Sequence, residues 1–553
     1  MAVDLVKTAG EPMETHGEQL SAVPELFDIS AYVDDFNRGI VPAYRRGTAD
    51  AELPADAGVA RSIIPPGTAA VRDFSHLAPQ IPEIDASKCV GCMACVSACP
   101  DTAILGVALP ESQARELVGT FAAAQPDPAL ATSTAMGHFA RTTKYADVPA
   151  KRGLEPASFG LFVDPVHCKG CAECVEVCTD LGHEALRMVD KVAQEPSGES
   201  TLDRYLRDIA LYHSLPPTPE AYRNEKALAD LMLGEHAIGY VGGAGSCAGC
   251  GQATALRMLV AATRQVHGPE SMGIVAATGC NTVYGSTYPF NPFLVPWTNS
   301  LFENAPADAL GIRARWDQDG HPERRLWAVG GDGAMYDIGF QALSRMVASG
   351  ADIKVIVLDT QVYSNTGGQA STASFGGQVT KLSAYGREIH GRPERRKELG
   401  RILIGHGDVY VAQTTPAHLN HFYRAVMDAN EYPGPAVIIV YTPCQPEHGI
   451  ADDASVRQSK LAVQCRAFPL FVYDPRKGST IAERLSLQGN PAVKEDWFTA
   501  ADGSVQDFLA FARTEGRFAP HFAADGTPTP EIAATNEDRL GNWHTLQELA
   551  GIR

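Results

Sequence analysis

The pattern of apolar and polar residues changes at about residue 239. From there on, short uninterrupted apolar runs alternate with longer segments whose apolar residues recur at helical spacing. The runs 326–329 and 353–358 are typical of strands buried on both faces. The segment between them has a helical pattern and completes a strand–helix–strand unit. We therefore predict an α/β fold with a parallel sheet over residues 239–475.

The chain before residue 239 is organised differently. Residues 1–75 are rich in Ala, Pro and Asp, and we interpret them as an extended arm and linker. Residues 76–190 contain two cysteine runs and predict a small α+β domain. The segment between these runs, 105–162, is long enough for an inserted helical hairpin, with one helix over Ala114–Ala124.

Two further segments flank the predicted sheet domain. Residues 191–238 have a helical pattern that Pro216 and Pro217 interrupt, which suits a connector between modules. Residues 476–553 are expected to form a C-terminal extension that packs on the sheet domain. The extension contains an amphipathic helix around Phe508 and no recognisable catalytic motif.

Composition and charge exclude several classes of function. With 553 residues and 45% hydrophobic content, the chain can bury more than one core. A net charge of −19 argues against binding of nucleic acids or anionic membranes. No apolar run reaches about 18 residues, the length that a membrane span needs. The N-terminus has no signal-peptide pattern, so a cytoplasmic location is expected.

Eight of the 13 cysteines occur in two runs with the same spacing. Lys88–Pro100 has the form C-x2-C-x2-C-x3-C-P, and His167–Thr179 repeats it with Thr179 in place of the proline. In bacterial two-cluster ferredoxins with this pattern, the fourth cysteine of each run binds the other cluster. Zinc is the alternative, but this repeated spacing matches no common zinc site. The expected 4Fe–4S ligand sets are Cys89, Cys92, Cys95 and Cys178 for one cluster, and Cys168, Cys171, Cys174 and Cys99 for the other.

Four of the remaining cysteines predict a third cluster. Cys247 and Cys250 precede a helix-patterned segment, and a helix N-terminus favours the thiolate form that binds metal. Cys280 and Cys444 each follow an apolar strand, so a parallel sheet would bring them to one edge. The alternative for these two is a small buried core thiol. Cys465 is interpreted as a packed thiol.

The motif Gly-Asp-Gly at residues 331–333 predicts a site for a bound anion and a cation. Ligands bind at the carboxyl ends of strands in open parallel sheets. Gly331 and Gly333 allow the backbone to approach a large anion. Asp332, with Thr360 or Asn365 after the next strand, offers oxygen ligands of the kind that Mg²⁺ takes when it bridges to phosphates. A glycine-rich turn with an N-capping aspartate is the alternative.

One dense basic segment stands out in this acidic chain. Arg387–Arg401 contains several arginines together with Lys397. We expect a solvated loop and helix face. The functional alternative is a docking patch for an acidic electron carrier or for the phosphates of coenzyme A (CoA).

The order of the motifs resembles that of pyruvate:ferredoxin oxidoreductase, a 2-oxoacid:ferredoxin oxidoreductase. The resemblance covers roughly residues 63–553 and matches the ferredoxin domain and the C-terminal domain that binds thiamine diphosphate (TPP). It implies three 4Fe–4S clusters, TPP and Mg²⁺. It also implies CoA-dependent oxidative decarboxylation of a 2-oxoacid, with pyruvate as the first candidate, to acyl-CoA and CO₂. Electrons would pass singly to ferredoxin or flavodoxin. The eight matching motifs are CVGCMACVSACP, CKGCAECVEVC, GSCAGCGQ, ATGCNTVYG, WTNSLFENA, GGDGAMYDIG, LDTQVYSNTGGQ and YTPCQPEHGI.

The resemblance also implies roles for individual residues. The family's Mg²⁺ ligands match Asp332, Thr360 and the backbone carbonyl of Val362. Asn365 matches a residue near the bound 2-oxoacid. Cys280 is expected to border the TPP as well as the third cluster. The family's cysteines for that cluster match Cys247, Cys250, Cys280 and Cys444.

This sequence departs from the family pattern at several points. Gln252 stands where the family commonly has Glu, and Ala334 replaces an aromatic residue. Another 2-oxoacid, such as 2-oxoglutarate or an aryl glyoxylate, is therefore an alternative substrate. A non-catalytic iron–sulfur electron-transfer subunit is an alternative from another class. The family's modules that activate thiamine, contact the substrate and bind CoA match no part of the chain, so we expect a partner subunit and a hetero-oligomer.

Overall fold

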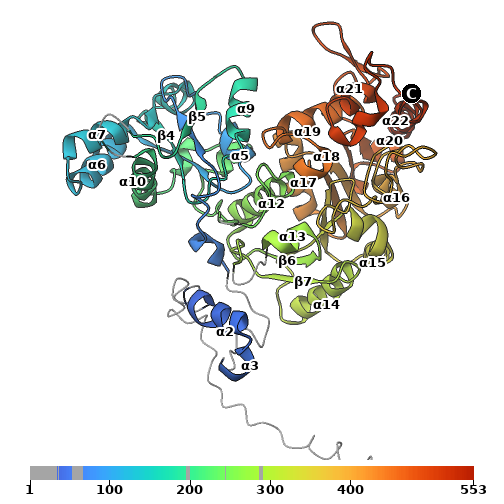
Figure 1. The fold of residues 1–553 in the computed structure, drawn as a ribbon, viewed down its shortest axis with the longest axis horizontal. Coiled ribbons are helices and arrows are strands. Elements are labelled where there is room, and N and C mark those ends of the chain that lie inside the picture. The colour runs from blue at the N-terminus through green and yellow to red at the C-terminus, as the bar shows by residue number, and fades with distance from the viewer. Residues whose placement is uncertain are drawn as a thin grey trace, which may run out of the picture.

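The computed structural model describes residues 34, 36–52, 66–194, 198, 200–242, 244–285 and 290–553 (Figure 1). The predicted arm, 1–75, therefore lies largely outside the described residues. No helix among the residues described is both long and apolar enough to cross a membrane. The described part of the arm contains the short helices η1 (Phe36–Ile40), α2 (Val41–Arg46), α3 (Ala49–Glu52) and η2 (Thr68–Val71).

The C-terminal half is built on one eight-stranded sheet with the order β13-β12-β10-β11-β9-β8-β6-β7. The strands from β10 to β7 run parallel, and β12 and β13 extend the sheet in antiparallel fashion. The predicted parallel sheet is confirmed. Its strands are β6 (Met272–Ala277), β7 (Trp297–Ser300), β8 (Arg325–Gly331), β9 (Lys354–Asp359), β10 (Tyr410–Thr414), β11 (Ala436–Tyr441), β12 (Phe471–Tyr473) and β13 (Leu485–Ser486).

Helices cover both faces of this sheet, which explains the unbroken apolar runs. Successive strand residues point to opposite faces. In β8, Trp327 and Val329 contribute to one hydrophobic core, whereas Leu326 and Ala328 contribute to the other. The first core is covered by α12 (Gly251–His267) and α17 (Leu419–Glu431). The second is covered by α14 (Ala305–Gln318), α15 (Phe340–Ala348), α16 (Leu399–Ile404) and α19 (Ser455–Gln464).

The cysteine-rich module has two small sheets. Strand β1 (Gln80–Ile84) pairs antiparallel with β5 (Leu186–Asp190), and the helices α5 (Ala94–Ala98) and α9 (Glu173–Asp180) pack together. The predicted inserted hairpin is confirmed as α6 (Glu111–Ala123) and α7 (Pro128–Met136). The second sheet contains β2 (Ile104–Pro110), β4 (Ala157–Val163) and β3 (Phe139–Ala140), and η3 (Thr143–Asp147) and α8 (Val148–Ala150) precede β4.

The predicted helical connector is also present. Helix α10 (Thr201–Ser214) ends before the two prolines. Two short helices, η4 (Glu220–Tyr222) and α11 (Leu228–Leu231), then lead toward the sheet domain. Leu228 and Leu231 pack in the same core as α12.

Buried polar contacts join the cysteine-rich module to the sheet domain. Lys169, 5% exposed at its side chain, forms an ion pair of 2.6 Å with Asp101. The same ammonium group donates to the carbonyl oxygens of Ala244 and Ser246, each at 2.8 Å. Glu173 accepts hydrogen bonds from backbone N–H groups at the start of α19. The cysteine-rich module thus supplies a donor and an acceptor that pair with backbone groups of the sheet domain.

The C-terminal extension completes the second core. Phe508 and Phe511 of α21 (Phe508–Ala512) are fully buried, as predicted for an amphipathic helix. Trp543 of α22 (Pro530–Leu549) is also fully buried in this core. The other elements in this part of the chain are η6 (Pro475–Lys477), α20 (Ile481–Arg484), β14 (Phe498–Thr499), β15 (Val505–Gln506) and η7 (Gly516–His521).

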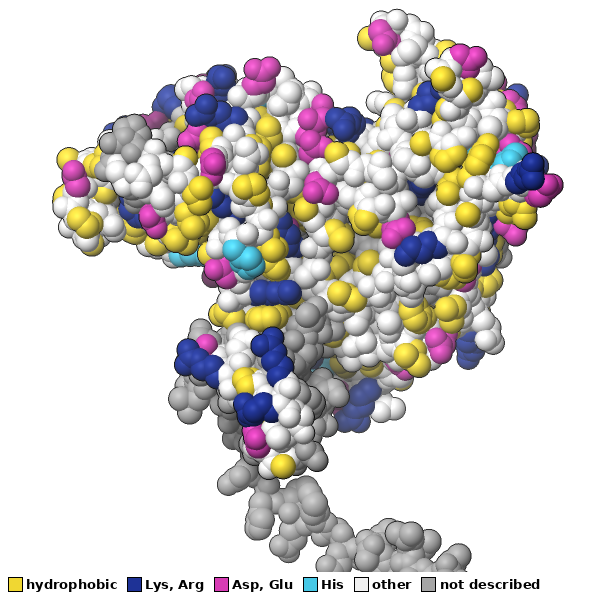
Figure 2. Space-filling model, in the orientation of Figure 1, with side chains coloured by type: hydrophobic (Ala, Val, Ile, Leu, Met, Phe, Trp, Pro, Cys, Tyr) yellow, Lys and Arg dark blue, Asp and Glu magenta, His cyan; other side chains and the backbone are white. Residues whose placement is uncertain are grey.

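The expectation of a solvated basic face over Arg387–Arg401 is wrong for two of its arginines. Arg396 and Arg392 are 6% and 7% exposed. Arg396 forms an ion pair with the fully buried Asp359, so its charge is used inside the protein. On the face shown in Figure 2, basic and acidic side chains are interspersed and form no broad basic area.

Candidate metal and cofactor site

The predicted site residues meet at the carboxyl edge of the parallel sheet. Asp332 follows β8, and Thr360 follows the neighbouring strand β9. Cys280 begins α13 (Cys280–Gly285) after β6, and Cys444 precedes α18 (Gln445–His448) after β11. Because β6, β8, β9 and β11 are parallel, their ends lie on one edge. The chain therefore brings distant residues to a single crevice.

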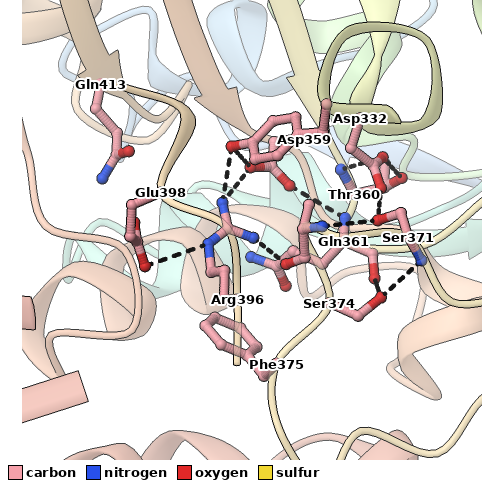
Figure 3. A network of polar contacts seen from close by, with 12 residues as sticks. Asp332, Asp359, Thr360, Gln361, Ser371, Ser374, Phe375, Arg396, Glu398 and Gln413 are labelled. Carbon is pink, nitrogen blue, oxygen red and sulfur yellow. Dashed lines mark hydrogen bonds and ion pairs between the residues drawn. The ribbon is translucent and has the colours of Figure 1, made fainter. Parts of the chain in front are cut away.

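Three oxygen atoms converge at this edge. Thr360 Oγ1 lies 3.0 Å from Asp332 Oδ1 and 2.9 Å from the carbonyl oxygen of Val362 (Figure 3 labels Asp332 and Thr360). Ser364 Oγ donates to Thr360 Oγ1 at 2.9 Å, and Ser371 Oγ donates to the other oxygen of Asp332. Carboxylate, hydroxyl and carbonyl oxygens are the ligands that Mg²⁺ prefers. The donor set fits this ion.

The electrostatics of the crevice also fit a cation. Asp332 is only 1% exposed. Burial raises its pKa, and the neighbouring Asp359 carboxylate raises it further, against hydrogen bonds from Ser371 and Thr360 that lower it. A buried carboxylate of this kind is stabilised by a bound metal ion. Asp359 itself forms an ion pair with Arg396 and accepts a 2.6 Å hydrogen bond from the Tyr336 hydroxyl.

A cavity of about 160 Å³ opens beside these oxygens. Gly333 borders it, and a Cβ atom there would lie 2.5 Å from the ring of Tyr363, so only glycine fits without displacement. Gln252, which is 6% exposed, faces the cavity, as does the buried Ala334. The predicted residues that line it are Gly331, Asp332, Gly333, Thr360, Val362, Asn365 and Cys280. Its glycine backbone and donor set fit a diphosphate with its metal ion.

A second cavity, of about 110 Å³, adjoins the first. All four cysteines of the predicted third set, Cys247, Cys250, Cys280 and Cys444, line it. The residues that line both cavities are Gln252, Cys280, Thr360 and Asn365. A group bound by the thiols would therefore share a wall with a group bound by Asp332.

The chemistry of the second cavity fits an iron–sulfur cluster. Burial raises the pKa of Cys250 to about 12, and it also raises the pKa of Cys280. Thiolates there require a positive centre. The hydroxyl of Tyr284 is buried beside Cys250 and Cys280, and it has no hydrogen-bond partner among the residues that the structure describes. It can therefore donate to a sulfur atom.

The two ferredoxin-type runs form two more thiol-lined cavities, with the crossed pairing predicted from their spacing. Cys178 joins the first run, and Cys99 joins the second. Burial raises the pKa of Cys168 to about 12. Cys92 is exposed at the cavity that it lines with Cys89, Cys95 and Cys178. None of the 13 cysteines forms a disulfide. In the described part of the chain, no three or more His, Cys, Asp or Glu side chains are grouped to hold a single metal ion.

Sequence reasoning missed several residues that shape the site. Buried His448 donates from Nε2 to the Thr360 carbonyl oxygen at 2.7 Å, and burial lowers its pKa well below the usual value. Ser371 holds Asp332, and Arg396 holds Asp359. His448 occurs in the motif YTPCQPEHGI, and its position four residues after Cys444 could have indicated that it lies near the site. The other two lie in segments with no local pattern that indicates their role.

Comparisons with known proteins agree with the two modules. Residues 277–440 match the family model "Thiamine pyrophosphate enzyme, C-terminal TPP binding domain". Residues 82–105 match the model "4Fe-4S binding domain". The first match contains Cys280, Asp332 and Thr360, together with the strands β8 and β9. One chain thus contains a segment similar to a TPP-binding domain and a segment similar to a 4Fe–4S binding domain.

Several curated relatives are named as pyruvate oxidoreductases. The chain is 29% identical to a pyruvate-flavodoxin oxidoreductase of Rhodospirillum rubrum, over 96% of this chain and 46% of the relative. It is 28% identical to a probable pyruvate-flavodoxin oxidoreductase of Escherichia coli, over 84% and 42%. It is 27% identical to the pyruvate:ferredoxin oxidoreductase of Moorella thermoacetica, over 83% and 41%. The expected resemblance is confirmed, and the chain spans less than half the length of these relatives.

Among solved structures, one similar chain belongs to a 2-oxoglutarate:ferredoxin oxidoreductase from Magnetococcus marinus with 2-oxoglutarate, coenzyme A and succinyl-CoA bound. It is 22% identical, with a TM-score of 0.32, over 36% of this chain and 64% of the other.

Proposed function

We propose that this chain is the TPP-binding and electron-transfer subunit of a 2-oxoacid:ferredoxin oxidoreductase, with pyruvate as the first candidate substrate. The reaction would be oxidative decarboxylation to acyl-CoA and CO₂, with CoA as acyl acceptor. The observation that carries the proposal is the wall shared by two cavities. One is lined by the Mg²⁺-type donors around Asp332, and the other is lined by four cysteines.

The chain's own residues have distinct roles in this proposal. Asp332, Thr360 and the Val362 carbonyl would hold Mg²⁺, and the glycine backbone at 331–333 would receive the diphosphate. TPP, when bound, supplies the carbanion chemistry of decarboxylation. Asn365 would contact the substrate end, because it borders both cavities. Cys280 would bind the third cluster and border the cofactor.

The three thiol sets support an electron route out of the site. Arg257 donates from Nε to the Cys99 carbonyl oxygen at 2.9 Å, which ties Cys99 to α12, the helix that begins directly after Cys250. Lys169 lines the cavity of the Cys99 set, and Ser246 lines the cavity of the third set. Because Lys169 donates to the Ser246 carbonyl oxygen, the two cavities are neighbours. We propose that electrons pass singly from the third cluster to the cluster of the Cys99 set, and from there to the cluster of the set that contains the exposed Cys92. Ferredoxin or flavodoxin would accept them there.

A partner subunit would supply the rest of the active site. The proposal is supported by exposed apolar side chains around the two cavities, where Leu301, Ile338 and Val283 are 59%, 54% and 46% exposed. Phe302 and Ile338 line the first cavity, and Val283 lines the second. Exposed apolar groups at a site are typical of interaction surfaces. The thiamine-activating, substrate-binding and CoA-binding groups would lie on that partner, in a hetero-oligomer.

One observation favours a different 2-oxoacid as the second candidate. Gln252 and Ala334, where this chain departs from the family pattern, both line the first cavity. A neutral amide in place of a carboxylate and a methyl group in place of an aromatic ring change the charge and the space beside the cofactor. A larger substrate, such as 2-oxoglutarate or an aryl glyoxylate, would use that space.

The test is co-purification from the native host, followed by assay. The purified complex is analysed for bound thiamine and tested on pyruvate, 2-oxoglutarate and an aryl glyoxylate with CoA and a one-electron acceptor. The proposal expects a second subunit, stoichiometric TPP, and turnover that requires CoA. A complex without TPP and without turnover would instead indicate a non-catalytic electron-transfer subunit. Omission of CoA is the matched control.

A further inference from the structure

Gln361 adopts an unusual backbone conformation between two expected Mg²⁺ donors. Its φ of 61° lies in the left-handed region, which non-glycine residues rarely occupy. The reversal at this position brings the Val362 carbonyl oxygen to 2.9 Å from Thr360 Oγ1. The conformation of Gln361 therefore decides whether the two donors face the same point.

The backbone of Gln361 is held on both sides. Its N–H donates to Asp359 Oδ1 at 3.1 Å (Figure 3). Its carbonyl oxygen accepts from Ser374 Oγ at 2.6 Å and from Gln378 Nε2 at 2.9 Å. Unfavourable backbone conformations persist where surrounding contacts fix them in this way, and such positions cluster at functional sites.

The side chain of Gln361 is held from a distant part of the chain. Arg517 Nη2 donates to Gln361 Oε1 at 2.7 Å. Arg517 Nε in turn donates to Glu515 Oε2 at 2.6 Å, and both of these side chains are at most 1% exposed. Glu515 also accepts from the Tyr441 hydroxyl at 3.0 Å. Glu515 and Arg517 belong to the C-terminal extension, whose role the sequence did not reveal.

We infer that Gln361 is a positioning residue, and that Arg517 and Glu515 clamp it so that Thr360 and Val362 form a preformed pair of metal donors. The inference rests on the proposed Mg²⁺–TPP site. A long neutral side chain suits the position, because its carbonyl oxygen reaches the guanidinium group without adding a second buried charge. The C-terminal extension thereby acts on the cofactor site as well as on the core.

Two substitutions at one position separate backbone positioning from side-chain packing. Gln361→Met and Gln361→Gly both remove the acceptor for Arg517 and leave the Arg517–Glu515 pair in place. Only glycine adopts a positive φ without cost. Loss of an outer partner of a metal site typically lowers metal affinity about 10- to 100-fold. We expect this loss in Gln361→Met, whereas Gln361→Gly should bind the metal much more nearly as the unmodified chain does.

The readout is binding rather than turnover. Mn²⁺ replaces Mg²⁺ in the full-length chain, and its affinity with TPP is measured by electron paramagnetic resonance and calorimetry. Arg517→Met should resemble Gln361→Met. Arg513→Met, which removes an exposed arginine of the same extension, is the control and should leave the affinity unchanged.

The outcomes distinguish this inference from the proposed function. If the unmodified chain binds neither Mn²⁺ nor TPP, even with its partner subunit, the proposed function fails. If it binds both, and Gln361→Met binds Mn²⁺ equally well, the clamp has no role in positioning. Equal losses in Gln361→Met and Gln361→Gly would also overturn the inference, because the backbone conformation would then be irrelevant. Should Arg517→Met not fold, the pair at position 361 still decides.

Discussion

Arg396 offers a direct test of the buried network beneath the metal site. Its side chain is 2% exposed, and that of its ion-pair partner Asp359 is fully buried. It also donates to the Tyr336 hydroxyl at 3.0 Å and to the Ala373 carbonyl oxygen. Methionine at this position fills similar space but leaves Asp359 charged and without its cation. Removing one partner of a buried ion pair typically costs about 3–5 kcal/mol in the free energy of unfolding.

This cost can be measured by unfolding the full-length chain with heat and with urea, with circular dichroism as the signal that monitors unfolding. Each kcal/mol lowers Tm by about 2–4 °C in a domain of 150–250 residues, so Arg396→Met should lower Tm by about 6–20 °C. Arg395→Met is the matched control, because this neighbouring side chain is 85% exposed and its pairing with Asp538, at 3.4 Å, is at the surface. Exposed pairs contribute about 0–1 kcal/mol.

A double variant tests the cause of the loss. Arg396→Met with Asp359→Asn removes the uncompensated charge and keeps an acceptor for the Gln361 N–H. It should recover part of the stability that Arg396→Met loses. The reasoning fails if Arg396→Met is within about 1 kcal/mol of Arg395→Met, since a buried uncompensated carboxylate should cost more than that.

Three other substitutions test the thiol cavities and the pH response. Cys444→Ala should remove one cluster, so that iron falls from about twelve to about eight atoms per chain; twelve atoms would refute the third ligand set. Tyr284→Phe removes a buried hydroxyl beside Cys250. Because hydrogen bonds to sulfur raise the reduction potential, this change should make the potential of the third cluster more negative in a redox titration. An unchanged potential would contradict a hydrogen bond from Tyr284 to a sulfur atom. Burial lowers the pKa of His421 from 6.5 to about 4, so the unfolded chain binds the extra proton and stability falls as pH drops from 6.5 toward 4. His421→Gln should reduce that fall in unfolding experiments, and an identical pH profile would show that His421 does not contribute.

Local patterns indicated which residues meet at the candidate site, whereas the roles of Val362 and Asn365 came from the family resemblance. The spacing of the cysteine runs groups the thiols as the two cavities do, with Cys178 beside the first run and Cys99 beside the second. The apolar strands were equally informative. Once β6, β8, β9 and β11 are placed in parallel, the residues after them must meet at one edge, as Cys280, Asp332, Thr360 and Cys444 do.

The residues that hold the site in shape depend on contacts between distant segments. Arg396 lies in a segment that looks solvated by composition, yet the carboxylate that it neutralises stands 37 positions earlier. Arg517 contacts Gln361 across 156 positions. No periodicity or spacing relates such pairs, and an arginine has the same sequence appearance whether it faces water or a buried carboxylate.

The sequence by itself therefore determined the elements, the sheet edge and the set of ligand-type residues. The tertiary structure alone decided which charges are buried and which backbone conformation presents Thr360 and Val362 together. The physical reason is that strand and helix periodicity arise from neighbouring residues, whereas desolvation and charge compensation depend on everything packed around a group. A buried carboxylate such as Asp359 acquires its partner only when the chain has folded.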